Sequence, residues 1–255
     1  MFWLKKLRRN RLSKQLFPDE WLRIIEKNVP LYNRLPSEDK AELRCHILIF
    51  IGEKRFEGCG GLNITDEIKV TIAAQACVLL LHRKTDYYPG LSSILVYPHS
   101  FVTNRAERSA SGVVTESPQV LLGESWHHGS VVLSWDDVLN GAADIHDGNN
   151  VVFHEFAHQI DSSGGRGDDN TVLSDRSKYI AWARVLQKDY EKLRSAAAQN
   201  HPAFLNKYGA TNPAEFFAVA TEFFFEKPQE LKEIHPELYM KLEEFYNQDP
   251  SNYLN

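Results

Sequence analysis

Two histidines four residues apart, with a glutamate directly after the first, constrain this chain more than any other feature. His154 and His158 lie in the segment 151–161, whose apolar residues recur with a helical period. Positions four apart on a helix lie one above the other, so both imidazoles can reach a single divalent metal ion. Glu155 points to one side of this pair, where it can accept a proton from a water that the metal acidifies. The pattern predicts a helix that holds a zinc site and its general base.

The same pattern also allows a simpler interpretation. An ordinary amphipathic helix can have two histidines on its polar face without binding a metal. The neighbouring sequence favours the metal site, because Val151, Val152 and Phe153 supply an apolar face and a Ser-Ser-Gly-Gly run that begins at Ser162 ends the helix soon after His158.

A catalytic zinc needs a third protein ligand and an open position for water. Two candidates, Glu215 and Glu222, lie seven residues apart on one face of an apolar segment. This segment begins with Asn212 and Pro213, which are typical of a helix start. A carboxylate in apolar surroundings is costly unless it is paired or bound to a metal. Spacing alone does not decide which glutamate is the ligand and which pairs with a basic residue.

Asp161 is a further carboxylate of the histidine helix. It falls on nearly the same face as His154 and His158. A side chain one turn further along would recede from an ion that both histidines hold, so a direct ligand role is disfavoured. Two interpretations stay open: Asp161 orients an imidazole from outside the metal site, or it is a solvent-exposed residue of the last helical turn.

Two stretches of this chain, residues 154–161 and 208–218, together resemble the peptidase signature of the Mlc titration factor A family. That family is related in its catalytic domain to anthrax lethal factor. The similarity extends over most of the chain, including 94–98, 123–135 and 245–250. The order and spacing of these pieces make the match specific, whereas no single piece outside the two signatures would be diagnostic.

The resemblance implies a zinc metallopeptidase with one Zn²⁺ per chain. His154 and His158 match the zinc-binding histidines of the family, Glu155 matches its general base, and Glu215 matches the glutamate that completes the metal site. The implied reaction is hydrolysis of a peptide bond by a metal-activated water.

Tyr208 matches a family tyrosine near the zinc that is thought to donate a hydrogen bond to the developing oxyanion, a role that suits a phenol in a dry cleft. Its simpler alternative is a packed loop residue. One departure from lethal factor is visible, because Val219 stands where that protein has a carboxylate one turn after its ligand. Support for the zinc would then come from Asp161 or Glu222.

Two classes of function follow from the resemblance. The first is an active zinc peptidase of aminopeptidase type that acts on small peptides or exposed protein ends. The second is a binding protein that captures the glucose-system repressor Mlc, and so regulates glucose phosphotransferase genes, with a zinc site that is inactive or needs activation. The two functions can coexist. A structural zinc is disfavoured, because only three protein ligands are evident and a general base is present.

Composition agrees with a cytoplasmic enzyme. A chain of 255 residues with 43% hydrophobic content can bury a sizeable core, and we expect a single zincin-like peptidase domain over 1–255. The net charge of -5 argues against nucleic acid as the main partner. Three cysteines without CxxC spacing fit packing thiols in a reducing compartment. The sequence has no apolar stretch long enough for a signal peptide or a membrane span.

Residues 1–14 contain six basic and no acidic side chains. We expect a loosely ordered, solvated arm here, although contact with anionic lipid or an acidic partner stays open.

The overall pattern predicts an α+β fold, predominantly helical and of zincin type, with a small mixed β-sheet beside the active-site helix. Residues 18–82 form the helical N-terminal portion of this prediction. The run 130–135 is rich in β-branched residues and could be an edge strand on which a peptide substrate lies, or a core strand without substrate contact. The predicted helices outside the two signatures are 18–29, 36–51, 64–81, 175–198 and 236–246, and the predicted strands are 94–97, 113–114 and 131–135.

Overall fold

The computed structural model describes residues 2–84, 86–108, 114–121, 123–126, 129–162 and 176–253. Its helices are α1 (Phe2–Leu12), α2 (Asp19–Asn28), α3 (Pro30–Arg34), α4 (Ser37–Glu53), α5 (Asp66–Val78), α6 (Trp135–Ala143), α7 (Val151–Ser162), α9 (Arg176–Ala198), α10 (Pro213–Glu226), α11 (Pro228–Ile234) and α12 (Pro236–Tyr246), with 3-10 turns η1 (Lys207–Ala210) and η2 (Pro250–Asn252). Its strands are β1 (Arg55–Gly58), β2 (Ser93–Tyr97), β3 (Phe101–Arg108), β4 (Val114–Leu121), β5 (Gly123–Trp126) and β6 (Ser130–Ser134).

Helices dominate, and the main sheet is small and mixed. Its strand order is β1-β2-β6-β5, in which β1, β2 and β6 are parallel and β5 is antiparallel. The strands β3 and β4 form a separate antiparallel pair. The predicted α+β class, with a small mixed sheet beside the histidine helix, is therefore confirmed. Among the helices in the described ranges, none combines the length and apolar character needed to cross a bilayer.

The suggestion that residues 130–135 form an edge strand is wrong. The strand β6 lies between β2 and β5, and Val131 and Leu133 are fully buried. A β-branched run indicates burial, but it does not specify the neighbours of a strand. The strand also ends one residue early, because the Ser134 hydroxyl accepts a hydrogen bond from the Asp137 amide and starts the unpredicted helix α6.

The N-terminal segment is not a loose arm. Residues 2–12 form α1, and the Arg9 guanidinium bonds Glu53 and Asp86, each at 2.7 Å. Both acidic partners lie far away in the sequence, so a local charge count could not reveal them. The expectation of a solvated arm is therefore wrong.

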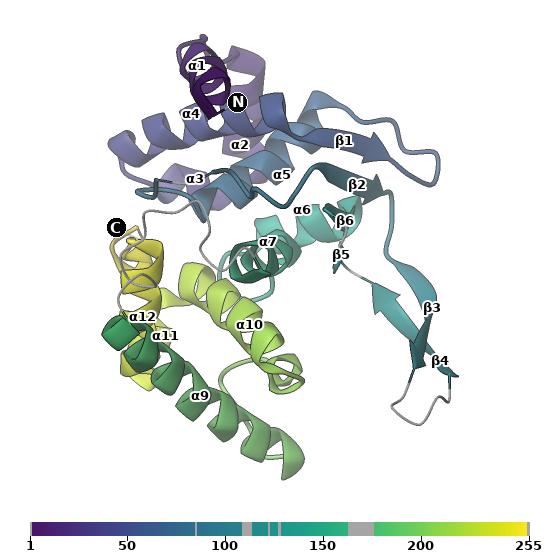
Figure 1. Cartoon of the computed structure of the whole chain (residues 1–255), viewed down its shortest axis with the longest axis vertical. Helices are drawn as coiled ribbons and strands as arrows, with labels where there is room; N and C mark the ends of the chain where they lie inside the picture. Colours follow the sequence, from purple (N-terminus) through teal and green to yellow (C-terminus); the bar gives the residue numbers. More distant parts are fainter. Residues whose placement is uncertain are drawn as a thin grey trace.

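The histidine helix α7 lies at the centre of the molecule. Figure 1 shows it between the N-terminal helices α4 and α5 on one side and α10 on the other. Phe156 of α7 packs against Phe50 of α4 and against Tyr88, with ring centroids 5.7 and 4.8 Å apart. On the opposite side Phe153 packs against Phe225 of α10. These contacts fix the position of α7 from two directions.

Candidate metal centre

Asn150 fixes the start of α7. Its carbonyl accepts a hydrogen bond from the His154 amide at 2.9 Å, and its side-chain oxygen accepts one from the Phe153 amide at 3.0 Å. The same side chain donates to Gln75 of α5 and Glu226 of α10, each at 3.0 Å. One buried asparagine therefore caps the helix and joins it to two neighbours.

The structure brings the two histidines and Glu215 together. The Nε2 atoms of His154 and His158 lie 3.2 Å apart, and the Glu215 Oε2 atom lies 2.9 Å from the first and 3.3 Å from the second. Glu215 reaches this position from the first turn of α10, where Asn212 accepts hydrogen bonds from the Ala214 and Glu215 amides. The predicted helix start at Asn212 is thereby confirmed.

Glu222 lies on the other side of the same imidazole. Its Oε1 atom is 2.8 Å from Nδ1 of His154, and its Oε2 atom accepts a hydrogen bond from the Asn150 amide at 2.6 Å. The side chain is 5% exposed, so this carboxylate holds His154 from within the protein interior. Such a carboxylate fixes the ring orientation and keeps Nε2 directed at a metal.

The charges of the cluster are strongly coupled. Burial disfavours the charged His154 imidazolium, but its bonds to Glu215 and Glu222 outweigh burial and raise the pKa of His154 to about 10. Burial opposes ionisation of Glu215 as well, yet the two histidines lower its pKa to about 2. Burial raises the pKa of Glu222. The two carboxylates therefore favour the charged form of His154 in this cluster.

The two side chains predicted to be catalytic, Glu155 and Tyr208, both interact with His154. Glu155 follows His154 on α7 and is 5% exposed. Tyr208 lies on η1, where the Asn206 side chain accepts a hydrogen bond from its amide. The Tyr208 ring centroid is 5.8 Å from that of His154, and the side chain is 55% exposed. Glu155 is thus a buried carboxylate, whereas Tyr208 stands at the solvent side of the site.

Asp161 differs from Glu222. In the described part of the chain it forms no hydrogen bond with either histidine, and its side chain is exposed. Burial by the surrounding atoms raises its pKa, against the opposing charge of His158. Of the two carboxylates considered as outer support for the metal, only Glu222 contacts an imidazole.

Comparison with known proteins identifies the family. The sequence profile described as glucose-regulated metallo-peptidase M90 matches residues 4–247. The chain belongs to this family. An uncharacterized protein of Synechocystis sp., slr2042, is 40% identical over 93% of this chain and 88% of its own length. Proteins named Mlc titration factor A from Serratia proteamaculans and Klebsiella pneumoniae are 30% and 29% identical, each over 87% of this chain and 85% and 84% of their own lengths.

The donor atoms of this M90 metallopeptidase fit a metal ion. One atom from each of His154, His158 and Glu215 lies within 4.8 Å of the others. Ligands about 2.0–2.1 Å from a tetrahedral zinc are about 3.3 Å from one another, close to the 2.9–3.3 Å found here. Three protein ligands leave one coordination position open, as in catalytic rather than structural sites.

Three residues that support the M90 site were missed by sequence reasoning. Asn150, Gln75 and Glu226 form a buried hydrogen-bonded group behind the histidines. An asparagine directly before an apolar helical run was a readable cap signal. No local signal pointed to Gln75 or Glu226, because their partners lie about 75 residues away along the chain.

Proposed function

We propose that this chain is a zinc-dependent peptidase in which His154, His158 and Glu215 hold Zn²⁺ and Glu155 is the general base. The observation that supports it is the convergence of three ligand atoms within 4.8 Å, backed by Glu222 on the outer nitrogen of His154. Imidazole and carboxylate donors in a three-ligand set with an open position suit Zn²⁺.

When bound, zinc would supply Lewis acidity that polarises the scissile carbonyl and eases deprotonation of water. Glu155 accepts the proton as the water oxygen bonds to the carbonyl carbon. The same carboxyl group then gives the proton to the amine nitrogen as the C–N bond breaks. The Tyr208 hydroxyl donates a hydrogen bond to the carbonyl oxygen as negative charge develops there. Glu222 keeps the Nδ1 proton of His154, so that Nε2 stays directed at the ligand site.

The substrate class in this proposal is small peptides or exposed protein N-termini, with aminopeptidase-type cleavage. The names of two relatives support a second function in the same molecule, which is capture of an Mlc-type transcriptional repressor. Such a partner would place the protein in the cytoplasm. The two functions are separable, because repressor capture needs no general base.

The decisive experiment combines elemental analysis with hydrolysis of a panel of aminoacyl chromogenic substrates. It compares the parent, Glu155→Gln and the exposed control Glu230→Gln. We expect about one zinc per chain in all three, and turnover that falls by about 10²–10⁴-fold only in Glu155→Gln. Equal cleavage by Glu155→Gln and the parent would exclude the proposed mechanism.

The repressor function is tested with the same proteins. Zinc-loaded Glu155→Gln is titrated with a purified Mlc-type repressor in a calorimeter. Binding equal to that of the parent, in a variant without turnover, supports capture that is independent of catalysis. Absence of binding by both proteins would remove the second function and leave the peptidase proposal untouched.

A further inference from the structure

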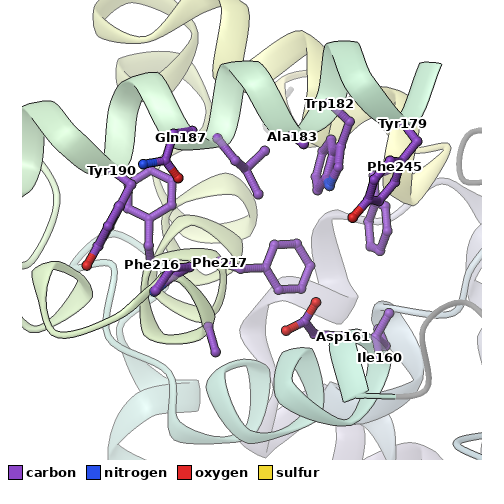
Figure 2. A pocket seen from close by; sticks show the side chains of 13 residues that line it. Ile160, Asp161, Tyr179, Trp182, Ala183, Gln187, Tyr190, Phe216, Phe217 and Phe245 are labelled. Carbon is purple, nitrogen blue, oxygen red and sulfur yellow. The ribbon is translucent and has the colours of Figure 1, made fainter. Parts of the chain in front are cut away.

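A cavity of about 440 Å³ lies beside the metal centre, between the end of α7, the helix α9 and the start of α10. Figure 2 shows that side chains from these helices, together with Phe245 of α12, surround it. Most of the large lining side chains are aromatic. None of the three proposed metal ligands lines the cavity, although residues close to two of them on α7 and α10 do.

Asp161 is the only charged residue among the described side chains that line this cavity. Its carboxylate points into the cavity from the last turn of α7 (Figure 2). The structure gives it no hydrogen bond or ion pair with another described residue. The side chain is solvent-accessible, although many protein atoms surround it, because it faces a concave space. Within the described part of the chain, this carboxylate therefore faces the cavity without a hydrogen-bond partner.

The opposite wall is aromatic, and its rings are largely buried against one another. Trp182 of α9 stacks on Phe245 with centroids 4.9 Å apart, and Phe217 of α10 meets Trp182 edge-on at 6.0 Å. Tyr179 lies at the rim and is 52% exposed. Trp182 stacks on Phe245 and the Arg83 guanidinium lies 4.8 Å from the Phe245 ring centroid, so the wall offers apolar surface for an alkyl chain rather than free ring faces for a cation. Together with one carboxylate, this wall matches a long side chain that is apolar along its stem and positive at its tip.

The cavity lies within one helical turn of two metal ligands. Asp161 follows His158 by three residues on α7, and the lining residue Ala214 directly precedes Glu215 on α10. Side chains three residues apart on a helix are about 5–6 Å apart at their Cβ atoms. A peptide whose carbonyl lies at the metal centre can therefore place an adjacent side chain in this cavity.

We propose that the cavity binds a lysine or arginine side chain next to the scissile bond, and that Asp161 determines this specificity. The alkyl stem of the substrate side chain lies against Trp182 and Phe217, and its cationic head pairs with Asp161. The proposal rests on the proposed peptidase function and adds its substrate preference.

The kinetic test uses arginine and citrulline p-nitroanilides, because citrulline has nearly the same shape as arginine without its charge. We expect the parent to prefer arginine by about 10–100-fold in kcat/KM, as a charge-assisted hydrogen bond implies. In Asp161→Asn this ratio falls to near one, because arginine loses its charged partner whereas citrulline has no charge to pair. Asp19→Asn removes the same charge at an exposed position of α2 and keeps the parent ratio. An equal loss for both substrates in Asp161→Asn overturns the proposal, because Asp161 would then act through the metal site.

A binding measurement separates failure of this proposal from failure of the peptidase. Zinc-loaded Glu155→Gln, with Asp161 or with Asn at position 161, is titrated with arginine amide and with citrulline amide by calorimetry. Preferential binding of arginine amide that requires Asp161 supports the cavity even if no substrate is cleaved. Equal affinity of Glu155→Gln for the two amides, together with cleavage of substrates by the parent, rejects the cavity proposal and leaves the peptidase proposal standing.

Discussion

At the scale of single residues, the His154 imidazole contacts both glutamates of α10. Sequence spacing left open which of the two is the metal ligand. His154 directs Nε2 at Glu215 and Nδ1 at Glu222, so the first glutamate belongs to the ligand cluster and the second supports it from behind. The sequence predicted both side chains on one helical face. The family resemblance assigned Glu215 to the metal, but spacing alone could not divide the two roles, because that division depends on how α7 packs against α10 and turns the ring of His154.

Glu222→Gln tests this division. Both partners of Glu222, the Nδ1 group of His154 and the Asn150 amide, are donors, and each uses a different carboxylate oxygen. An amide offers one acceptor oxygen, so the variant directs an N–H group at one of the donors. We expect zinc affinity to fall by about 10–100-fold, measured by competition with a chromophoric chelator. Glu230→Gln is the control, and unchanged affinity in Glu222→Gln would exclude the supporting role.

Gly148, close to the start of α7, occupies a position where any larger residue would destabilise the fold. Its φ is +76°, and an added Cβ would lie 2.7 Å from the buried ring of Phe223 on α10. We expect Gly148→Ala to lower the free energy of unfolding by about 2–4 kcal/mol, from backbone strain and overpacking combined.

Gly61→Ala is the matched control for Gly148→Ala. Gly61 has a φ of +82°, but nothing lies within 4 Å of an added Cβ. The control variant therefore loses unfolding free energy through backbone strain alone, about 1–2 kcal/mol. Urea denaturation of the zinc-loaded proteins gives both values. Equal losses of unfolding free energy in the two variants would show that the Phe223 ring moves aside without destabilising the protein.

At the scale of elements, the start of α10 links helix stability to the metal centre. The Asn212 side chain accepts hydrogen bonds from the amides of Ala214 and Glu215, so the cap fixes the backbone of a proposed ligand. We expect Asn212→Ala to cost about 1 kcal/mol of stability and to weaken zinc binding. Asn212→Ser keeps a capping oxygen and should restore most of both quantities. Parallel chelator titration and thermal unfolding measure them, and zinc affinity that is equal in all three proteins would show that the cap acts on stability alone.

Local signals predicted the helices better than the sheet. Asn212 with Pro213 correctly predicted the start of α10, and the apolar period around His154 correctly predicted α7. The position of β6 inside the sheet depends on its pairing with β2 and β5, which are distant or weakly patterned segments. Strand order is a property of the assembled sheet, and a single strand sequence does not contain it.

At the scale of the whole molecule, charged side chains join segments that are far apart in the chain. Arg9 of α1 binds Glu53 of α4 and Asp86, and the nearby Lys54 donates hydrogen bonds to the carbonyls of Tyr88 and Leu91 at 2.8 and 2.6 Å. The basic residues of the N-terminal segment are visible in the sequence, but their acidic partners could not be predicted from it. Only the packing of α1 on α4 brings the opposite charges together.

Lys54 makes the stability of this region dependent on pH. Burial lowers the pKa of Lys54 from 10.5 to about 8, against the opposing charge of Glu53. Between these values the unfolded chain binds more protons than the folded chain, so this group adds stability as pH rises from about 8 toward 10.5. The neutral amine keeps two N–H groups, which is enough for both carbonyl partners.

We therefore expect the difference in unfolding free energy between the parent and Lys54→Met to move in favour of the parent by about 1–2 kcal/mol from pH 7.5 to 9.5. Other groups also titrate in this range. Their contributions to the unfolding free energy cancel in the difference, because both proteins contain these groups. Urea denaturation of the two zinc-loaded proteins at several pH values gives the difference directly. Lys6→Met, at an exposed position of α1, should show the same pH dependence of the unfolding free energy as the parent. A constant difference between the parent and Lys54→Met would mean that Lys54 stays charged in the fold, with both carbonyls solvating its ammonium group.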